Sequence, residues 1–253
     1  MKLIALDSSG LVASVAVLCD QELVGEYTIN HKKTHSQTLL PMLDELKSMT
    51  ELELDTVDAI AVAGGPGSFT GLRIGSATAK GLAWTMNVPV ISVPTIDAMA
   101  YHFYGSDKLI CPVMDARREQ VYCGIYTIER VTDEQDSEDT GYFGTYRLKI
   151  IKESCAISVE ELVGQLNQLA QDVIILGDGV PVYQEKIKEL LKVPYSFAPA
   201  HCNRQRAANV AVLGAAYYAE GKVQAAKDHA PEYLRLSQAE RERMEEMQGE
   251  KSS

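Results

Sequence analysis

The chain lacks long apolar runs, and it has few positive charges. None of its apolar runs approaches the roughly 18 residues that a membrane span needs, so no membrane association is expected. The segment 1–7 has no signal-peptide core and is predicted to form a first strand, which favours a cytoplasmic protein. Lys and Arg number 24 against 35 Asp and Glu, and the net charge of −11 argues against unaided binding to nucleic acid.

Closely spaced cysteines are also absent. The five cysteines are far apart and include no C-x-x-C pair, which argues against a zinc cluster or a disulfide framework. We therefore expect reduced thiols at Cys19, Cys111, Cys123, Cys155 and Cys202.

Sets of metal ligands and catalytic residues are missing too. His31 and His35 have the i, i+4 spacing of helical metal ligands, but a Ser or Thr N-cap beside His35 would leave His31 outside the helix. The other histidines have no evident Ser or Cys nucleophile in their sequence context: His102, His201 and His229. Neither a metal site nor a catalytic set is predicted.

The hydrophobic pattern predicts one succession of strands and helices that occurs twice. In the first half, strands are predicted at 2–7, 11–18 and 22–29, then a helix at 36–49, a strand at 57–63, a helix at 71–86, a strand at 89–93 and a helix at 95–104. In the second half, strands are predicted at 109–115, 119–128 and 141–152, then a helix from Ser158, a strand at 173–177 and helices at 180–192 and 204–220.

This repetition predicts two α/β lobes, each a mixed sheet with helices on its faces. The first lobe is expected over 1–104 and the second over 105–237, and the helix at 204–220 can pack back on the first lobe. A charged, flexible tail is expected at 238–253, and a solvated acidic loop at 129–140.

The most informative segment is 64–75, a glycine-rich turn between a buried strand and a helix. Its free backbone N–H groups can hold an anion, or its small residues can let a second backbone approach closely. It is no Walker loop, because no Gly-Lys-Ser/Thr follows, and its third glycine comes one residue too late for a dinucleotide fingerprint. Ser68 lacks the Gly-x-Ser-x-Gly spacing of a nucleophile elbow. A structural turn is favoured over each of these enzyme motifs.

Small residues then recur at every fourth position of the following helix: Gly71, Gly75, Ala79 and Ala83. Such a stripe lets another helix come unusually near, and packing against the protein's own sheet is an equally supported alternative. Arg73 is the single charge of the turn and can bind an anion or a partner's carboxylate. The helix at 36–49 offers a leucine face that is core at least in part and can extend into an interface.

Three turns combine aspartate with small residues at the ends of predicted strands. They hold Asp7, Ser8 and Ser9; Asp115; and Gly177, Asp178 and Gly179. In open α/β sheets ligands bind at such ends, and two lobes can hold a phosphate and its magnesium ion between them. Asp and Gly are also ordinary turn residues. We expect an ancestral nucleotide cleft with at most weak binding of ATP or ADP with Mg²⁺, and no required cofactor.

Together these motifs resemble the bacterial TsaB (YeaZ) family. The resemblance covers most of the chain, from 3–9 to 230–235. It rests most on His35-Ser36-x-x-Leu39-Leu40-Pro41, on 65–75 and on Asp115-Ala116-Arg117. It implies a duplicated ribonuclease-H-like fold of the actin–Hsp70–sugar-kinase (ASKHA) superfamily. It also implies a part in making N6-threonylcarbamoyladenosine at position 37 of tRNA.

In this family the active site belongs to a paralogous partner, TsaD. The two positions of the metal-binding His-x-x-x-His of TsaD fall here on Thr95 and Met99, so the resemblance implies a non-catalytic sister subunit. It also implies that the helices at 36–49 and 71–86 contact TsaD, that the ATPase TsaE joins them, and that tRNA binds only through the complex. The contact residues expected are His35, Leu39, Leu40, Leu43, Phe69, Gly71, Arg73, Gly75 and Ala79. Homodimer formation by the free protein is left open.

The residues alone leave two other functions open. An ATP-dependent small-molecule kinase of the same superfamily would use Asp7 and Asp115 around magnesium-ATP. A metallopeptidase would require a bound metal ion. Tight binding of magnesium-ATP with turnover would favour the kinase, and metal content below one equivalent would remove the peptidase.

Overall fold

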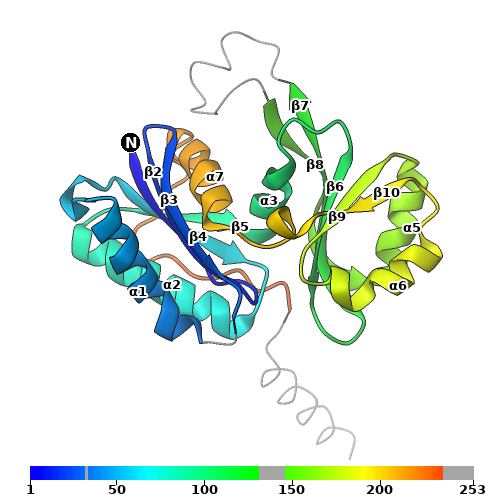
Figure 1. Cartoon of the computed structure of the whole chain (residues 1–253), viewed down its shortest axis with the longest axis horizontal. Coiled ribbons are helices and arrows are strands. Elements are labelled where there is room, and N and C mark those ends of the chain that lie inside the picture. The colour runs from blue at the N-terminus through cyan, green and yellow to red at the C-terminus, as the bar shows by residue number, and fades with distance from the viewer. Residues whose placement is uncertain (32–33, 131–145, 236–253) are drawn as a thin grey trace, which may run out of the picture.

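The structure, a computed structural model, describes residues 1–31, 34–130 and 146–235. Figure 1 shows two sheets side by side, each covered by helices on both faces. Three short 3-10 helices complete the described secondary structure: η1 (Leu54–Thr56), η2 (Tyr101–Phe103) and η3 (Ala200–Cys202). In this part of the chain, no helix combines the length and apolarity needed to cross a bilayer.

The first sheet has the strand order β3-β2-β1-β4-β5, in which the first three strands run antiparallel and β4 and β5 run parallel to β1. Its elements and the helices between them are β1 (Lys2–Asp7), β2 (Ala13–Cys19), β3 (Glu22–Ile29), α1 (His35–Met49), β4 (Ala59–Gly65), α2 (Phe69–Met86) and β5 (Val90–Pro94). The two parallel connections are helical crossovers, as parallel neighbours require.

The second sheet repeats this order as β8-β7-β6-β9-β10, with the same pattern of antiparallel and parallel pairs. Its elements are α3 (Thr95–Ala100), β6 (Leu109–Asp115), β7 (Gln120–Arg130), β8 (Tyr146–Ser158), α5 (Val159–Leu169), β9 (Val173–Leu176), α6 (Val180–Leu190), β10 (Tyr195–Phe197) and α7 (Ala207–Ala219). The predicted duplication of an α/β lobe with mixed sheets is confirmed.

The alternation of side chains along β1 explains why each sheet is covered on both faces. Ile4 and Leu6 pack with α1 and α2, whereas Leu3 and Ala5 point to the opposite face and pack with α7. Because all four side chains are fully buried, β1 is a central strand with no polar face.

Helices α3 and α7 each pack on the sheet of the other half of the chain. Helix α7 packs on the first sheet, where Gly214 lets it approach the Ala61 side chain closely. Helix α3 packs Ile96 and Met99 against the second sheet. The chain after α7 stays with the first lobe, since Gln224 bridges to Val90 of β5. The first lobe therefore also holds 207–224: the division at 104/105 placed these residues in the second lobe but allowed the helix at 204–220 to pack back on the first.

The predicted elements agree with the observed ones except at their ends and in two further details. Strand β10 was not predicted, because three residues are too few for a periodic signal. Strand β8 continues to Ser158, which caps α5 by accepting a hydrogen bond from the Glu161 N–H. Most of the predicted acidic loop at 129–140, the first part of the strand predicted at 141–152 and the predicted tail at 238–253 lie outside the described residues.

Candidate functional site

The glycine-rich turn brings β4 and α2 against the loop that follows β1. Gly65 has a φ of +124°, a left-handed conformation that favours glycine. A Cβ on Gly67 would lie 2.3 Å from the carbonyl oxygen of Ser9. Ser68 caps α2 by accepting a hydrogen bond from the Gly71 N–H. The turn therefore serves close approach of two backbones, as the structural interpretation predicted.

The stripe of small residues on α2 faces the protein's own interior. A Cβ on Gly71 would lie 2.0 Å from the Ser8 carbonyl oxygen, and one on Gly75 would lie 2.5 Å from Ser8 Oγ. Ala79 and Ala83 are buried in the core of the first lobe. The prediction that Gly71, Gly75 and Ala79 contact a partner is therefore wrong, because β1 and its loop already occupy the space beside them.

The predicted contact residues of helix α1 lie partly in the core and partly at the surface. Leu39 and Leu43 are buried against the first sheet, so their assignment to a partner contact is also wrong. Leu40 points outward with 51% of its surface exposed. The Nε2 atom of His35 lies 2.9 Å from the Gly10 carbonyl oxygen, which ties the start of α1 to the loop after β1. His31 precedes α1, as predicted.

An apolar groove lies on the outer side of α1, η1 and α2. This α1–α2 groove has a volume of about 770 Å³, and it is lined by Leu40, Leu54, Asp55, Ala77, Thr78, Gly81, Leu82, Thr85 and Met86. A Cβ built on Gly81 would have no described atom within 4 Å. Trp84 of the same helix is 73% exposed. Except for Leu40, sequence reasoning missed these residues, although Leu82 and Met86, four positions apart, signal a second apolar side of α2.

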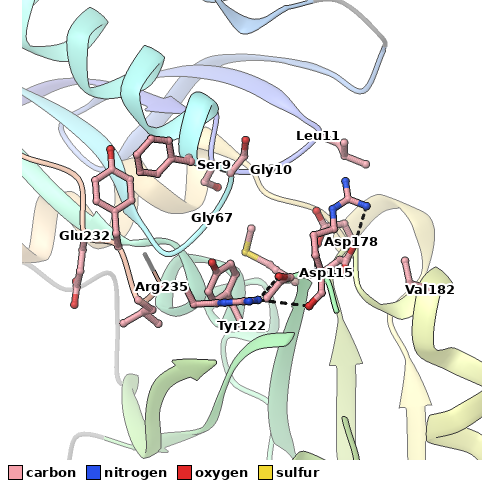
Figure 2. Close-up of a pocket in the computed structure, with 17 residues that line it drawn as sticks. Ser9, Gly10, Leu11, Gly67, Asp115, Tyr122, Asp178, Val182, Glu232 and Arg235 are labelled. Atoms are coloured by element: carbon pink, nitrogen blue, oxygen red, sulfur yellow. Dashed lines mark hydrogen bonds and ion pairs between the residues drawn. The ribbon is translucent and has the colours of Figure 1, made fainter. Parts of the chain in front are cut away.

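A cleft between the lobes collects the turns that the sequence singled out. Ser9 follows β1, Gly67 follows β4, Asp115 ends β6 and Asp178 follows β9, and all four line one cleft of about 390 Å³ (Figure 2). These are the carboxyl ends of parallel strands, where open α/β sheets bind ligands.

The other residues predicted for a nucleotide do not line this cleft. Asp7 is buried beside it. The Ser8 hydroxyl donates a hydrogen bond to the Gly71 carbonyl. A Cβ on Gly177 would lie 2.2 Å from the Val113 carbonyl oxygen, and one on Gly179 would lie 2.9 Å from the Val113 side chain, so these glycines serve packing.

The acidic groups at the cleft already have partners within the chain. Burial raises the pKa of Asp7 to about 6, and its Oδ1 accepts hydrogen bonds from the Ser9 N–H and hydroxyl. Burial also raises the pKa of Asp178. The Asp115 carboxylate accepts hydrogen bonds from the Arg117 N–H at 2.8 Å and the Tyr183 hydroxyl at 3.0 Å. The carboxylates of Asp7, Asp115 and Asp178 therefore already accept hydrogen bonds from groups of this chain.

Residues 232–235, here called the C-terminal strap, cross the cleft from one lobe to the other. In the first lobe the Glu232 N–H donates to the Gly64 carbonyl at 2.7 Å, and the Tyr233 ring packs 4.5 Å from that of Phe69. Arg73 lies 3.9 Å over the Phe69 ring and donates to the Tyr233 hydroxyl at 3.3 Å. Phe69 and Arg73, both predicted to contact a partner, therefore bind the strap.

Arg235 completes the strap in the second lobe. Figure 2 shows its side chain extending across the cleft toward the end of β6. Its guanidinium donates hydrogen bonds to the carbonyl oxygens of Ala116 and Arg117. The strap thus links the start of α2 to the turn that follows Asp115, and sequence reasoning did not foresee this link.

Replacing Arg235 by alanine should loosen this link. Two charge-assisted hydrogen bonds are lost, which is worth about 1–2 kcal/mol or roughly a tenfold increase in local opening. Hydrogen exchange of the amides at 116–120 should accelerate by that factor. The control Tyr233→Phe removes only the hydroxyl bond to Arg73 and should leave exchange at 116–120 unchanged. Unchanged exchange in Arg235→Ala would show that the strap does not hold the second lobe.

The fold and the cleft together define the class. Two lobes of one five-strand topology, with the carboxyl ends of their parallel strands at a shared cleft, make this a duplicated α/β fold of two mixed sheets. Residues 22–243 match the model of the TsaD family, described as tRNA N6-adenosine threonylcarbamoyltransferase. The chain belongs to this family and, within it, to the TsaB (YeaZ) group, as its relatives establish.

Two of these relatives are named tRNA threonylcarbamoyladenosine biosynthesis protein TsaB. That of Bacillus subtilis is 30% identical over 95% of this chain and 96% of its own length. That of Haemophilus influenzae is 35% identical over 73% of this chain and 75% of its own length. YeaZ from Pseudomonas aeruginosa superposes with a TM-score of 0.71 at 26% identity, over 92% of this chain and 99% of that one.

Proposed function

We propose that this chain is the non-catalytic subunit of the machinery that makes N6-threonylcarbamoyladenosine at position 37 of tRNA, and that it binds and activates the TsaD paralogue through the α1–α2 groove. The observation that carries the proposal is an outward apolar groove on the two helices that the family resemblance assigns to TsaD. Leu40 lines the groove with 51% of its surface exposed, and Trp84 of α2 is 73% exposed outside the groove lining. Contiguous exposed apolar surface marks protein interfaces.

The positions that match the TsaD histidines support a role without catalysis. Thr95 and Met99 are both buried in α3. Met99 packs with Ile110 and Met114 between α3 and the second sheet. A thioether in an apolar core is a poor ligand for the divalent ions that imidazoles hold. In our proposal the transfer of the threonylcarbamoyl group from its adenylate takes place on TsaD.

The remaining partners follow from the same proposal. TsaE joins the pair, and tRNA binds through the complex, because a chain of net charge −11 repels a phosphate backbone. The cytoplasmic location stays a prediction. Homodimer formation by the free protein stays open, and the mass of the free protein in solution tests it.

Reconstitution tests the proposal. TsaD and TsaE from the same organism are mixed with unmodified tRNA, threonine, bicarbonate, ATP and the enzyme that forms the adenylate, with and without this chain. Threonylcarbamoyladenosine should form only in the complete mixture, and this chain with tRNA and the adenylate alone should form none. Equal modification without the chain, or modification by the chain unaided, would overturn the proposal.

The kinase alternative rests on the cleft, where Asp115 and Asp178 meet Ser9 and Gly67. Magnesium-ATP entering it would have to compete with the strap, since Arg235 binds the Ala116 carbonyl there. Calorimetry on the isolated chain distinguishes the two functions. Sub-micromolar binding with turnover would favour a kinase, and weak binding without turnover would favour the scaffold.

A further inference from the structure

Two cysteines of the second lobe face each other across neighbouring strands, away from the groove and the cleft. Cys123 of β7 and Cys155 of β8 are directly paired in the antiparallel register. Their side chains therefore point to the same face of the sheet. Directly opposed residues have Cα atoms about 4.5–5.5 Å apart, within the range of about 4.4–6.8 Å that a disulfide spans. The backbone thus already has the separation that a Cys123–Cys155 bond needs.

The two thiols differ in exposure and in chemistry. Cys123 is fully buried, and Cys155 is partly exposed. The neighbouring Cys123 thiol, together with the nearby Lys152 ammonium, outweighs burial and lowers the pKa of the Cys155 thiol. An accessible thiolate beside a second thiol is the arrangement that distinguishes redox-sensitive cysteines.

We propose that Cys155 and Cys123 form a reversible oxidation site, in which Cys155 reacts with a hydroperoxide and Cys123 closes a disulfide. In the first step the Cys155 thiolate attacks the peroxide, an S–O bond forms, the O–O bond breaks and hydroxide leaves. In the second step the Cys123 sulfur attacks Cys155, an S–S bond forms and the S–O bond breaks, and the departing hydroxide takes the Cys123 proton to leave as water. A dithiol reductant reverses the change.

The other cysteines lack this arrangement. Burial raises the pKa of Cys111 to about 12, and it raises those of Cys19 and Cys202 as well. Among the described strands, neither Cys19 nor Cys111 is paired with a cysteine.

Peptide mapping tests the proposal on the full-length protein without any partner subunit. The protein is treated with hydrogen peroxide, free thiols are alkylated under denaturing conditions, and trypsin is added. The expected product is a link between peptides 119–130 and 153–186 that dithiothreitol removes, with the other three cysteines alkylated. The intact protein should have lost two hydrogens.

Two variants assign the roles of the sulfurs. In Cys123→Ser, Cys155 should accumulate as a sulfenic acid that dimedone traps. In Cys155→Ser, Cys123 should stay unoxidised, because it is buried. Circular dichroism of each reduced variant confirms that it folds. The proposal is overturned if the wild-type Cys155 is trapped by dimedone without any Cys123 link, if the link involves Cys111, or if neither cysteine reacts while Cys19 or Cys202 does.

Discussion

Replacing Gly71 by alanine should destabilise the protein by about 3 kcal/mol or more, enough to unfold much of it at physiological temperature. The added Cβ would lie 2.0 Å from the Ser8 carbonyl oxygen, which is backbone and cannot rotate away. Helix propensity alone would stabilise the variant by about 1 kcal/mol. A net loss in the free energy of unfolding would therefore show that the steric clash outweighs this gain. Urea unfolding monitored by circular dichroism measures it.

Gly81→Ala is the matched control on the same helix. A Cβ there would meet no described atom within 4 Å, so only the propensity gain of about 0.5–1 kcal/mol remains, and this variant should be slightly more stable than the wild type. If Gly71→Ala were as stable as Gly81→Ala, the stripe would not pack on the loop after β1, and its assignment to a partner contact would return.

Replacing Gly81 by arginine should weaken TsaD binding by at least about 100-fold, or roughly 2.7 kcal/mol, without destabilising the fold. In the proposed complex the new guanidinium would be buried in an apolar groove with Leu82 and Met86. An unpaired charge in such a place is strongly unfavourable. Calorimetry with purified TsaD measures the loss, and co-purification gives an independent reading.

Gly164→Arg provides the matched control in the other lobe. Gly164 lies in the middle of α5, and a Cβ there would also meet no described atom within 4 Å. This variant carries the same added charge on an exposed helical position and should bind TsaD like the wild type. If both variants bound normally, the partner would have to dock elsewhere. Equal weakening of both would show that the added charge itself, and not its position in the groove, lowers the affinity for TsaD.

Gly71 and Gly81 illustrate what the sequence could not decide, namely what packs beside a helical glycine. Both are helical glycines, and the recurrence of small residues identified a helix side that something approaches closely. A stripe of glycine and alanine suits a foreign helix and the chain's own β1 loop equally well, because either needs only the absence of side chains. Only the position of Ser8 beside Gly71 decides that the occupant is internal.

The strap shows a second limit. Arg73 and Tyr233 are 160 positions apart and hydrogen-bonded, and no local pattern predicts a contact between such distant residues. The single charge in the glycine-rich turn was therefore expected to bind an anion or a partner, whereas the structure stacks it on Phe69 beside Tyr233.

The sequence by itself determined the order of strands and helices, the duplication of the lobe and the turns at the strand ends, because periodicity, capping and glycine are local signals. It also placed the chain near TsaB through its motifs. The tertiary structure alone decided which side of α2 is core and which is groove, which lobe α7 covers, and what crosses the cleft. These outcomes depend on which segment, distant in the sequence, packs into each space, and interior packing density leaves room for only one.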